Sequence, residues 1–495
     1  MHISVWVRWK GLLAVMQKLD LSALNSLSAN VIVPQYSRDD LTAGIVHIGV
    51  GNFHRAHMAV YLDALFSTGR DHDWAIVGAG IKSFDADRRA ALKEQDWLTT
   101  VVELAPESLT ARVTGSMIDF CEVETEALLA QLCAPEIRIV SLTVTEGGYF
   151  VDAKTGLFDA KHPDILADAA APQTPKTVFG ILLLALQRRR AAGIDPFTIL
   201  SCDNLPENGH VTSNTVLGLA EMIGADLKEW VQANVAFPNS MVDCITPATT
   251  DRERALVKEQ FGIIDSAPVA CEPFRQWVME DNFPFGRPRL EHVGVTFVGN
   301  VTPYETMKLR ILNAGHAAIA YPGALLGYEF VHEAMADEDI RAWLIHVMRT
   351  DVMPILPPID GESFEDYLQM CVERFSNPRV GDTIDRLCLD GSNRQPKFVV
   401  PTIQEALAAG TSLKALALEV AFWCKYCADC PDLQDERAEV LRTAALASRT
   451  DPSAFLKITS VFGDLAHEER FAIEFAAQID QLWTLDVRDV IRGTI

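Results

Sequence analysis

The chain has 495 residues, of which 49% are hydrophobic and 22% are charged, and its formal net charge is −24. This length exceeds what one hydrophobic core supports, so we expect two domains in an ordinary globular protein. The acidic balance argues against a nucleic-acid partner, because phosphate contacts need clustered Lys and Arg. The most apolar runs are short or carry charges, which argues against a membrane span.

Residues 1–15 are predicted to be an extension outside the folded domains. Their apolar stretches are interrupted by Arg8 and Lys10 and lack a small-residue cleavage site, unlike a secretory signal. Met16 would start the chain equally well. The ten cysteines are mostly scattered, which is typical of thiols in a reducing compartment. We therefore expect a cytoplasmic protein.

The segment 16–298 is predicted to be a Rossmann-type domain. Short, largely apolar runs separated by amphipathic stretches are typical of parallel strands that are buried on both faces. Such runs occur at 44–50, 74–81, 137–144 and 197–201. The pattern predicts a doubly wound α/β sheet.

A glycine-rich turn follows the first predicted strand. Gly49 permits a tight turn, and Gly51 lets the backbone approach a pyrophosphate, as in dinucleotide-binding folds. The helix that starts next adds a positive dipole end for the same phosphates. The turn and this helix start predict cofactor contacts from Gly49, Gly51, Asn52, Phe53 and Arg55.

The choice of nicotinamide cofactor is predicted from the end of the second strand. Asp85 lies there, and a carboxylate accepts hydrogen bonds from ribose hydroxyls but repels a 2′-phosphate. Lys82 opposes this interpretation, because its amine would pair with a phosphate. We predict NAD as the cofactor.

Two short motifs have the spacing of partial metal sites. They are the H-x-x-H pair His54 and His57 and the C-x-x-C-x-x-C run Cys424, Cys427 and Cys430. Neither motif has nearby residues that complete a ligand set for zinc or a cluster. We therefore favour a role beside the phosphates for the histidines and free thiols for the cysteines, and we expect no metal.

The segment 299–495 is predicted to be a mainly α-helical domain that carries the substrate and catalytic residues. The boundary is placed near Pro303, because proline suits the first turn of a helix. Strand signals are few after this point, and long helical patterns occur at 305–328, 337–352, 364–375 and 412–427.

Four polar residues share one stripe of the first helix in this domain. At about 100° per residue they fall within an arc of about 140°, so they could converge on one small molecule. A surface helix, which would turn its Lys and Glu toward solvent, is the alternative. The stripe, which predicts an active-site wall, consists of Glu305, Lys308, Asn313 and His316.

Motifs along the chain resemble those of the polyol-specific long-chain dehydrogenases, and the similarity covers essentially the whole chain from about Leu19. Within this family the mannitol-oxidising members are the most similar, and hexuronate reductases belong to the same family. The motifs are G-x-G-x-F-H-R-A-H from Gly49, T-V-T-E-G-G-Y from Thr143, S-C-D-N-L-P from Ser201, A-C-E-P-F-R-Q-W from Ala270, R-F-S-N from Arg374, and the set Lys308, Asn313 and His316.

The resemblance implies a metal-independent reaction with Lys308 as the general base. Burial and nearby dipoles would bring the pKa of such an amine toward neutrality. Asn204 and Asn313 would donate hydrogen bonds to the developing alkoxide, and His316 would bind a substrate hydroxyl. Glu305 would relay the proton to solvent, with a plain helix-start carboxylate as the alternative.

Four further residues bear on the cofactor and the substrate. Glu146 is expected near the nicotinamide, with a simple turn carboxylate as the alternative, and Asp243 is expected at the substrate or orienting a neighbour. Arg386 matches the position at which mannitol-type members hold substrate hydroxyls. Arg275 lies in a segment that resembles the uronate reductases, and it could bind a carboxylate through a bidentate pair, with a structural role as the alternative.

Together these features predict an NAD-dependent enzyme that oxidises a polyol such as D-mannitol to the 2-ketose D-fructose and catalyses the reverse reduction. One alternative is a fructuronate reductase, which would need an anionic substrate. The other is a non-catalytic nucleotide-binding regulator, against which the joint presence of the lysine, the amides and the imidazole argues. A monomer is the family default.

Overall fold

The computed structural model describes residues 16–152 and 155–495, which form two compact units that meet in sequence at Val301 and Thr302. The predicted extension 1–15 lies outside the described residues. Within the described ranges, no helix is both long enough and apolar enough to cross a bilayer.

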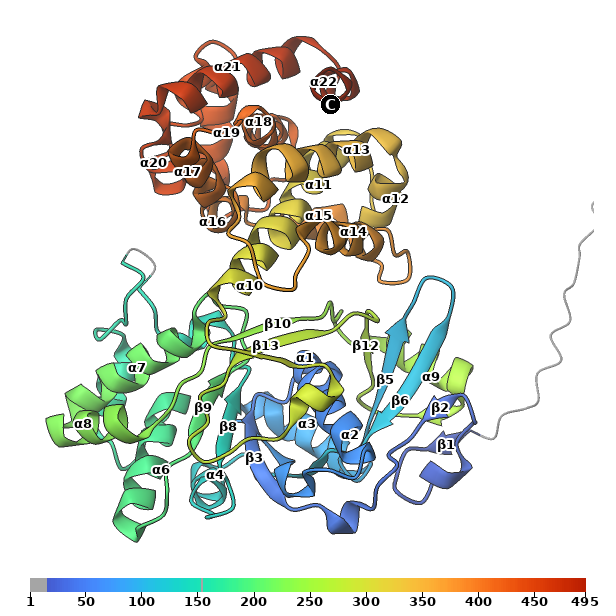
Figure 1. Ribbon diagram of the computed structural model, residues 1–495, viewed down its shortest axis with the longest axis vertical. Coiled ribbons are helices and arrows are strands. Elements are labelled where there is room, and N and C mark those ends of the chain that lie inside the picture. Colours follow the sequence, from blue (N-terminus) through green and yellow to red (C-terminus); the bar gives the residue numbers. More distant parts are fainter. Residues whose placement is uncertain (1–15, 153–154) are drawn as a thin grey trace, which may run out of the picture. The chain divides into compact units, whose positions relative to one another are not determined.

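A five-stranded parallel sheet forms the centre of the first unit (Figure 1). When its strands are numbered in chain order, their spatial order across the sheet is third, second, first, fourth and fifth. The strand order therefore reverses between β3 and β8. Ligands of open α/β sheets bind at the carboxyl ends of the strands beside such a reversal. In spatial order the strands are β7 (Met117–Phe120), β4 (Ala75–Ala79), β3 (Ala43–Ile48), β8 (Ile139–Leu142) and β9 (Thr198–Ser201).

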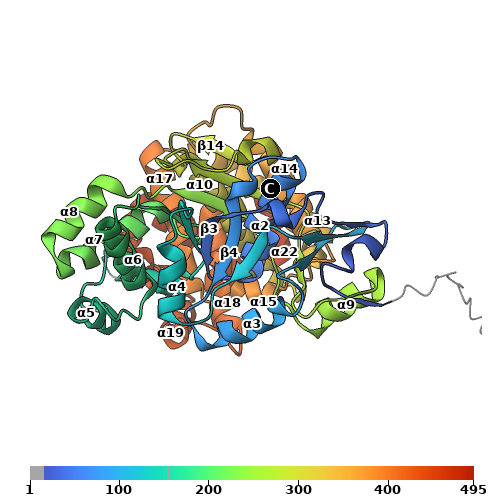
Figure 2. The same cartoon turned by 90° about the horizontal axis from the view of Figure 1, so that it is seen from below.

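The predicted strands coincide with β3, β4, β8 and β9, which confirms the doubly wound α/β prediction. Figure 2 shows β3 and β4 side by side, as their parallel pairing requires. Strand β7 was not predicted, because its alternation of buried and exposed positions, including exposed Asp119, differs from a continuous apolar run.

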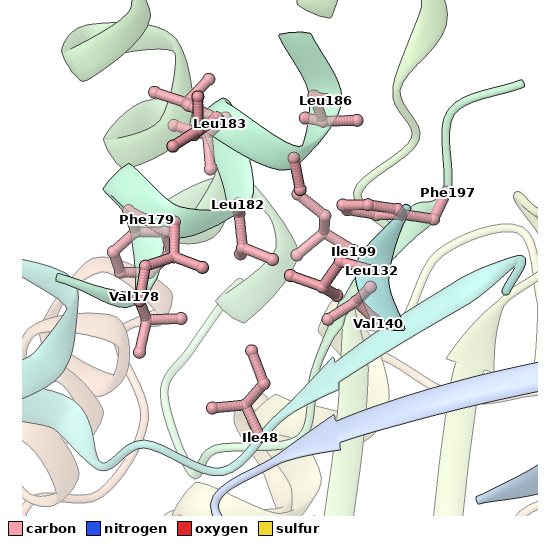
Figure 3. Close-up of a cluster of buried hydrophobic side chains, with 14 of the residues drawn as sticks. Ile48, Leu132, Val140, Val178, Phe179, Leu182, Leu183, Leu186, Phe197 and Ile199 are labelled. Carbon is pink, nitrogen blue, oxygen red and sulfur yellow. The ribbon is translucent and has the colours of Figure 1, made fainter. Parts of the chain in front are cut away.

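Helix α6 (Val178–Ala192) supplies much of the core on one half of this sheet (Figure 3). Its residues from Val178 to Leu186 are all buried, as expected of a helix that is apolar around its whole circumference. In the same cluster lie Val140 of β8 and Ile199 of β9. Burying each such side chain contributes about 1.5–3 kcal/mol, so this packing fixes the positions of β8 and β9 against α6.

Among the described residues, three smaller sheets complete the first unit. Two of them contain antiparallel pairs, β5 with β6 and β10 with β13, which the alternating strand and helix pattern did not predict. Their strands are β1 (Gln17–Lys18), β2 (Val31–Ile32), β5 (Thr99–Leu104), β6 (Leu109–Thr114), β10 (Ser240–Asp243), β11 (Ile263–Ile264), β12 (Val269–Cys271), β13 (Gln276–Glu280) and β14 (Thr296–Val298).

Nine α-helices of the first unit lie within the described residues. Besides α6 they are α1 (Asn52–Ala56), α2 (Met58–Ser67), α3 (Ser83–Lys93), α4 (Thr125–Leu132), α5 (Pro163–Ala170), α7 (Asn208–Ile223), α8 (Ala225–Asn234) and α9 (Asp251–Phe261).

The second unit is built from α-helices (Figure 1), which confirms the prediction of a helical second half. They are α10 (Thr302–Met307), α11 (Ala314–Leu325), α12 (Val331–Ala336), α13 (Glu338–Val347), α14 (Phe364–Phe375), α15 (Ile384–Cys388), α16 (Gly391–Phe398), α17 (Val400–Ala409), α18 (Lys414–Asp429), α19 (Ala438–Ala447), α20 (Thr459–Phe462), α21 (Glu469–Thr484) and α22 (Val487–Thr494).

One predicted helix differs in its internal geometry. The pattern over 305–328 predicted a regular α-helix, whereas α10 and α11 are joined by a π-helical turn over Lys308–Asn313. A second π-helical turn, Met348–Val352, follows α13. Hydrophobic periodicity does not detect one wider turn within a long helix, and such turns are frequent at functional sites.

Candidate active site

The glycines of the turn after β3 differ in what they accommodate. Gly49 has φ +100°, and a Cβ there would lie 2.2 Å from the carbonyl oxygen of Thr143 at the end of β8. A Cβ at Gly51 would meet only the Gly49 carbonyl oxygen, at 3.8 Å. The fold therefore requires the first glycine, while the second leaves bare backbone that suits the close approach of a pyrophosphate.

Asn52 and Arg55, both in α1, stabilise this turn through hydrogen bonds. The Asn52 amide donates to Thr249 Oγ1 at 2.9 Å, and its oxygen accepts from Arg55 Nη2 at 2.8 Å. Arg55 is buried, and its Nε donates to the carbonyl oxygen of Gly51 at 3.2 Å. These contacts support the turn from within the protein, and direct contacts of Asn52, Phe53 and Arg55 with a cofactor stay predictions.

The histidines of the same motif are packed against other rings. His54 stacks on His47 of β3 with 3.5 Å between ring centroids, and Phe53 stacks on His57 at 4.7 Å. Burial lowers the pKa of His47 to about 3 and lowers the pKa of His54 well below its ordinary value, so both rings are neutral. Across the described residues, no three potential ligand side chains gather as a metal site would need.

Asp85 lies at the start of α3, beyond the end of β4. Its Oδ2 accepts a hydrogen bond from the Lys82 backbone N–H at 2.9 Å, so this oxygen caps the helix. A Cβ at Gly80 would lie 2.3 Å from Asp85 Cβ, so glycine there allows the carboxylate to stand close to the strand end. The ribose contact predicted for Asp85 is untested.

The turn after β8 is organised by Asp203, which the sequence analysis missed. Asp203 accepts hydrogen bonds from the N–H groups of Val144 and Thr145, both at 2.9 Å, and from the Tyr149 hydroxyl at 2.6 Å. The carboxylate thereby fixes the turn that carries Glu146, whose side chain is exposed. Its sequence signal was its place in the S-C-D-N-L-P motif, two residues after β9, but the sequence did not reveal its partners, because they lie more than 50 positions earlier.

Asn204 follows Asp203 at the end of β9 and is exposed. The adjoining strand β10 is held to the same end of β9 by Asn208, whose Nδ2 donates to the carbonyl oxygens of Ser201 at 3.2 Å and Ser240 at 2.7 Å. Asp243 is the buried last residue of β10, three positions beyond Ser240. A shared role for Asn204 and Asp243 stays a prediction.

The stripe predicted in the second unit spans the π-helical turn. Glu305 and Lys308 are buried, and Lys308 and Asn313 occupy the first and last positions of the wide turn. In a regular α-helix residues five apart point about 140° away from each other. Closing the turn with i→i+5 hydrogen bonds brings these two positions onto neighbouring parts of one face.

His316 is a buried imidazole one turn further along α11. Its ring lies 4.3 Å from that of Phe375, centroid to centroid, and its Nε2 has no hydrogen-bond partner among the described residues. Burial lowers the pKa of His316 well below its ordinary value, and the charges of Arg386, Arg394 and Arg374 lower it further. A neutral imidazole with an open buried nitrogen is suited to bind a hydroxyl group.

Arg386 makes a bidentate pair with Asp382, with Nη2 to Oδ2 at 2.6 Å, and its side chain is 52% exposed. Arg394 donates to the Leu387 carbonyl oxygen at 2.6 Å. The sequence analysis selected Arg386 but missed Arg394 as a neighbour of His316, since a lone Arg inside a polar helix carries no local signal.

Arg275 is enclosed by its own protein partners. Its Nη2 donates to Glu103 Oε1 at 2.7 Å and to Cys271 Sγ at 3.5 Å, and its Nε donates to the Ala56 carbonyl oxygen at 2.7 Å. Glu103 therefore occupies the carboxylate position that a uronate would need. The structural interpretation of this arginine fits its contacts better.

The cysteine run is part of the fold of α18. Cys424 and Cys427 are buried on the core side of that helix, and Cys424 Sγ lies 3.4 Å from Ser448 Oγ. Cys430 is partly exposed at the end of the helix. Burial of two thiols in the core accounts for the spacing without a ligand.

Two family models match the chain in succession. The mannitol dehydrogenase Rossmann domain matches residues 43–292, and the mannitol dehydrogenase C-terminal domain matches residues 300–483. A mannitol 2-dehydrogenase from Cereibacter sphaeroides is 54% identical over 474 residues, which cover 94% of this chain and 99% of that protein. Another, from Phaeosphaeria nodorum, is 43% identical over 490 residues, which cover 97% of this chain and 85% of that protein.

Two solved structures resemble the model over nearly its whole length. The ternary complex of Pseudomonas fluorescens mannitol 2-dehydrogenase with NAD and D-mannitol has a TM-score of 0.84 at 43% identity and covers 96% of this chain and 99% of that one. A D-sorbitol dehydrogenase in substrate-free form has a TM-score of 0.89 at 34% identity and covers 96% and 100%. This chain belongs to the mannitol dehydrogenase family.

Proposed function

We propose that this chain acts as an NAD-dependent mannitol 2-dehydrogenase, which oxidises D-mannitol to D-fructose and catalyses the reverse reduction. One observation carries the proposal: the buried neutral imidazole of His316, with an open Nε2, lies on the same continuous helix as Lys308 and Asn313. The names of the similar proteins from Cereibacter sphaeroides and Pseudomonas fluorescens support the choice of reaction.

In this proposal the second unit handles the alcohol. Lys308 accepts the proton of the substrate hydroxyl during oxidation and returns it during reduction, and general-base catalysis of this kind contributes about 10²- to 10⁴-fold. Asn313, with Asn204 of the first unit, donates hydrogen bonds to the oxygen as it gains negative charge. His316 binds a neighbouring hydroxyl, and Glu305 passes the proton on toward solvent.

The first unit holds the dinucleotide. When bound, NAD supplies a nicotinamide ring that accepts or returns the hydride. Gly49 and Gly51 leave the backbone bare for the pyrophosphate, Asp85 takes the ribose hydroxyls through the oxygen that does not cap α3, and Glu146 lies beside the nicotinamide. The carboxylate of Asp85 disfavours a 2′-phosphate, so NAD is preferred over NADP.

A fructuronate reductase is the second candidate, and one observation favours it. Arg386, Arg394 and Arg374 act together on His316, and such a group of positive charges would suit a carboxylate. Two contacts weigh against it, because Arg386 is already paired with Asp382 and Arg275 with Glu103. A neutral polyol, held by hydrogen bonds to arginine, is the better fit.

The test measures initial rates of reduced-cofactor consumption with three substrates, each with NADH and with NADPH. The substrates are fructose, fructuronate and sorbose, which is the ketose that sorbitol gives when it is oxidised at a different carbon. We expect fructose with NADH to give the highest kcat/KM. Preference for fructuronate would replace the mannitol assignment, and equal use of NADPH would remove the role of Asp85. The Asp85→Ala variant is the matched control for cofactor choice, since it should narrow the NADH preference without changing the preferred ketose.

The proposal includes a monomeric protein of the cytoplasm. Buried thiols such as Cys424 and Cys427 suit a reducing compartment. Light scattering on the purified chain, at concentrations around those used for kinetics, would give one chain's mass if the monomer assignment is right.

A further inference from the structure

Phe84 is a large apolar side chain in an unusual position. It is 66% exposed, the highest exposure of any large hydrophobic side chain in the described ranges, and it is the sole aromatic residue in that exposed set. Single exposed apolar residues are ordinary on protein surfaces, so the exposure alone assigns nothing. Its position beside the proposed ribose-binding carboxylate supplies the argument.

Phe84 is the second residue of α3, directly before Asp85, and α3 follows β4 (Figure 2). In a sheet of this order, the acidic residue after the second strand takes the ribose on the adenine side of the dinucleotide. β4 is the second strand of the parallel sheet. The base attached to that ribose must therefore lie close to the first turn of α3.

The backbone that carries Phe84 is fixed with respect to the dinucleotide turn. The helix start is closed by the hydrogen bond from the Lys82 N–H to Asp85 Oδ2 at 2.9 Å. One turn later, Arg88 Nη1 donates to the carbonyl oxygen of Val50, between the two turn glycines, at 3.3 Å. A phenyl ring on such a rigid support loses little freedom when a flat ring stacks on it.

We propose that Phe84 is the stacking surface for the adenine ring of the dinucleotide. The inference rests on the proposed function for the identity of the cofactor, and it adds the residue that binds the base. Stacking of a base on an aromatic ring depends on the π-face and needs no hydrogen bonds from the side chain. Burying an otherwise exposed phenyl ring against adenine also removes apolar surface from water.

The experiment compares Phe84→Ala and Phe84→Trp with the unchanged protein. The matched control is Ile473→Ala, which removes a 60% exposed apolar side chain from the second unit. Dissociation constants are measured for NADH and for ADP-ribose, and turnover of fructose is measured with NADH and with reduced nicotinamide mononucleotide, which lacks the adenosine half.

Phe84→Ala is expected to raise the dissociation constants of NADH and ADP-ribose by the same factor, about 5- to 30-fold. This factor is at the lower end of the range for base stacking on an aromatic side chain. The kcat at saturating NADH and the rate with reduced nicotinamide mononucleotide should not change. Phe84→Trp should restore binding, and Ile473→Ala should bind like the unchanged protein.

Unchanged binding of ADP-ribose by Phe84→Ala would overturn the inference. A loss that extends equally to reduced nicotinamide mononucleotide would also overturn it, because the substitution would then act on the domain as a whole. The proposed function and the proposed adenine site can fail independently. If the protein reduces no ketose but binds ADP-ribose through Phe84, the dehydrogenase function is refuted and the adenine site is supported.

Discussion

At the scale of single residues, burial determines which protonation states the side chains can adopt. His316 is neutral because its ring is out of water and close to positive charges, and this neutrality leaves a nitrogen able to bind a hydroxyl. Lys308 is buried on the same helix, and burial of this kind is what the proposed role of its amine as a proton acceptor requires. Both properties come from surroundings that the local motif does not contain.

Lys308→Ala should lower kcat for fructose reduction and mannitol oxidation by about 100-fold or more, because the general base is lost. The dissociation constant of NADH should stay within error, and added methylamine should restore part of the rate. Stopped-flow and steady-state kinetics measure these quantities. Lys414→Ala, which removes an exposed lysine of the same unit, is the control, and a Lys308→Ala protein of normal kcat would refute the assigned role.

Glu419 is a buried carboxyl outside the proposed site. It accepts a hydrogen bond from Gln395 Nε2 at 2.7 Å, and burial raises its pKa from 4.5 to about 8. The folded chain therefore keeps a proton that the unfolded chain loses between these two pKa values. The stabilisation is complete below the lower value and is lost as the pH rises through the higher one, by at most about 1.4 kcal/mol per pH unit.

Glu419→Gln should flatten this part of the stability profile, because an amide keeps the hydrogen bond with Gln395 and does not titrate. Urea unfolding at pH 5.5 and at pH 8.5 measures the effect. The variant should gain stability over the unchanged protein at the higher pH. At each of the two pH values, its kcat should equal that of the unchanged protein. Parallel profiles for the two proteins would show that Glu419 is not the group responsible.

At the scale of elements, the π-helical turn has the most direct bearing on the proposed catalysis. A regular helix would separate Lys308 and Asn313 in direction, and the wide turn brings them to one face. The turn contains one residue more than a regular α-helix would need to return to the same face. Deleting one residue would leave Lys308 and Asn313 four positions apart, which a regular helix also keeps on one face, whereas inserting one residue would turn them away from each other.

Inserting one alanine after Leu309 should leave the helix content measured by circular dichroism nearly unchanged and lower kcat by about 100-fold, since misplacement of a catalytic group by about 1 Å has effects of this size. NADH affinity, which depends on the first unit, should be retained. Inserting one alanine after the exposed loop residue Gly361 is the control for the gain of one residue in this unit. Full activity after the insertion at Leu309 would contradict the positioning role of the turn.

At the scale of the whole molecule, two units with different construction divide the work. The first unit has a parallel sheet whose strand order reverses between β3 and β8, and this reversal defines the place for a dinucleotide. The second unit contains the helix with the amine, amide and imidazole. Each unit has an extensive set of buried side chains, so each holds its own functional residues in place.

Much of this architecture could be predicted from the sequence, because it depends on local periodicity. Apolar runs located β3, β4, β8 and β9, and helical patterns located α14 and α18 to within two residues at each end. Family motifs correctly indicated the mannitol dehydrogenase family. The turn glycines and the polar stripe from Glu305 to His316 could also be identified from the sequence, since each lies within one short continuous segment.

The remaining features were decided by tertiary structure. Asp203 holds a turn from more than 50 residues away, the arginines near His316 come from separate helices, and Glu103 occupies the partner position of Arg275. The sequence alone determined the secondary-structure pattern, the family and the candidate site residues, because these follow from local spacing. Only the folded chain decided which charges meet, which groups lose water and where the helix widens, because these depend on contacts between distant segments.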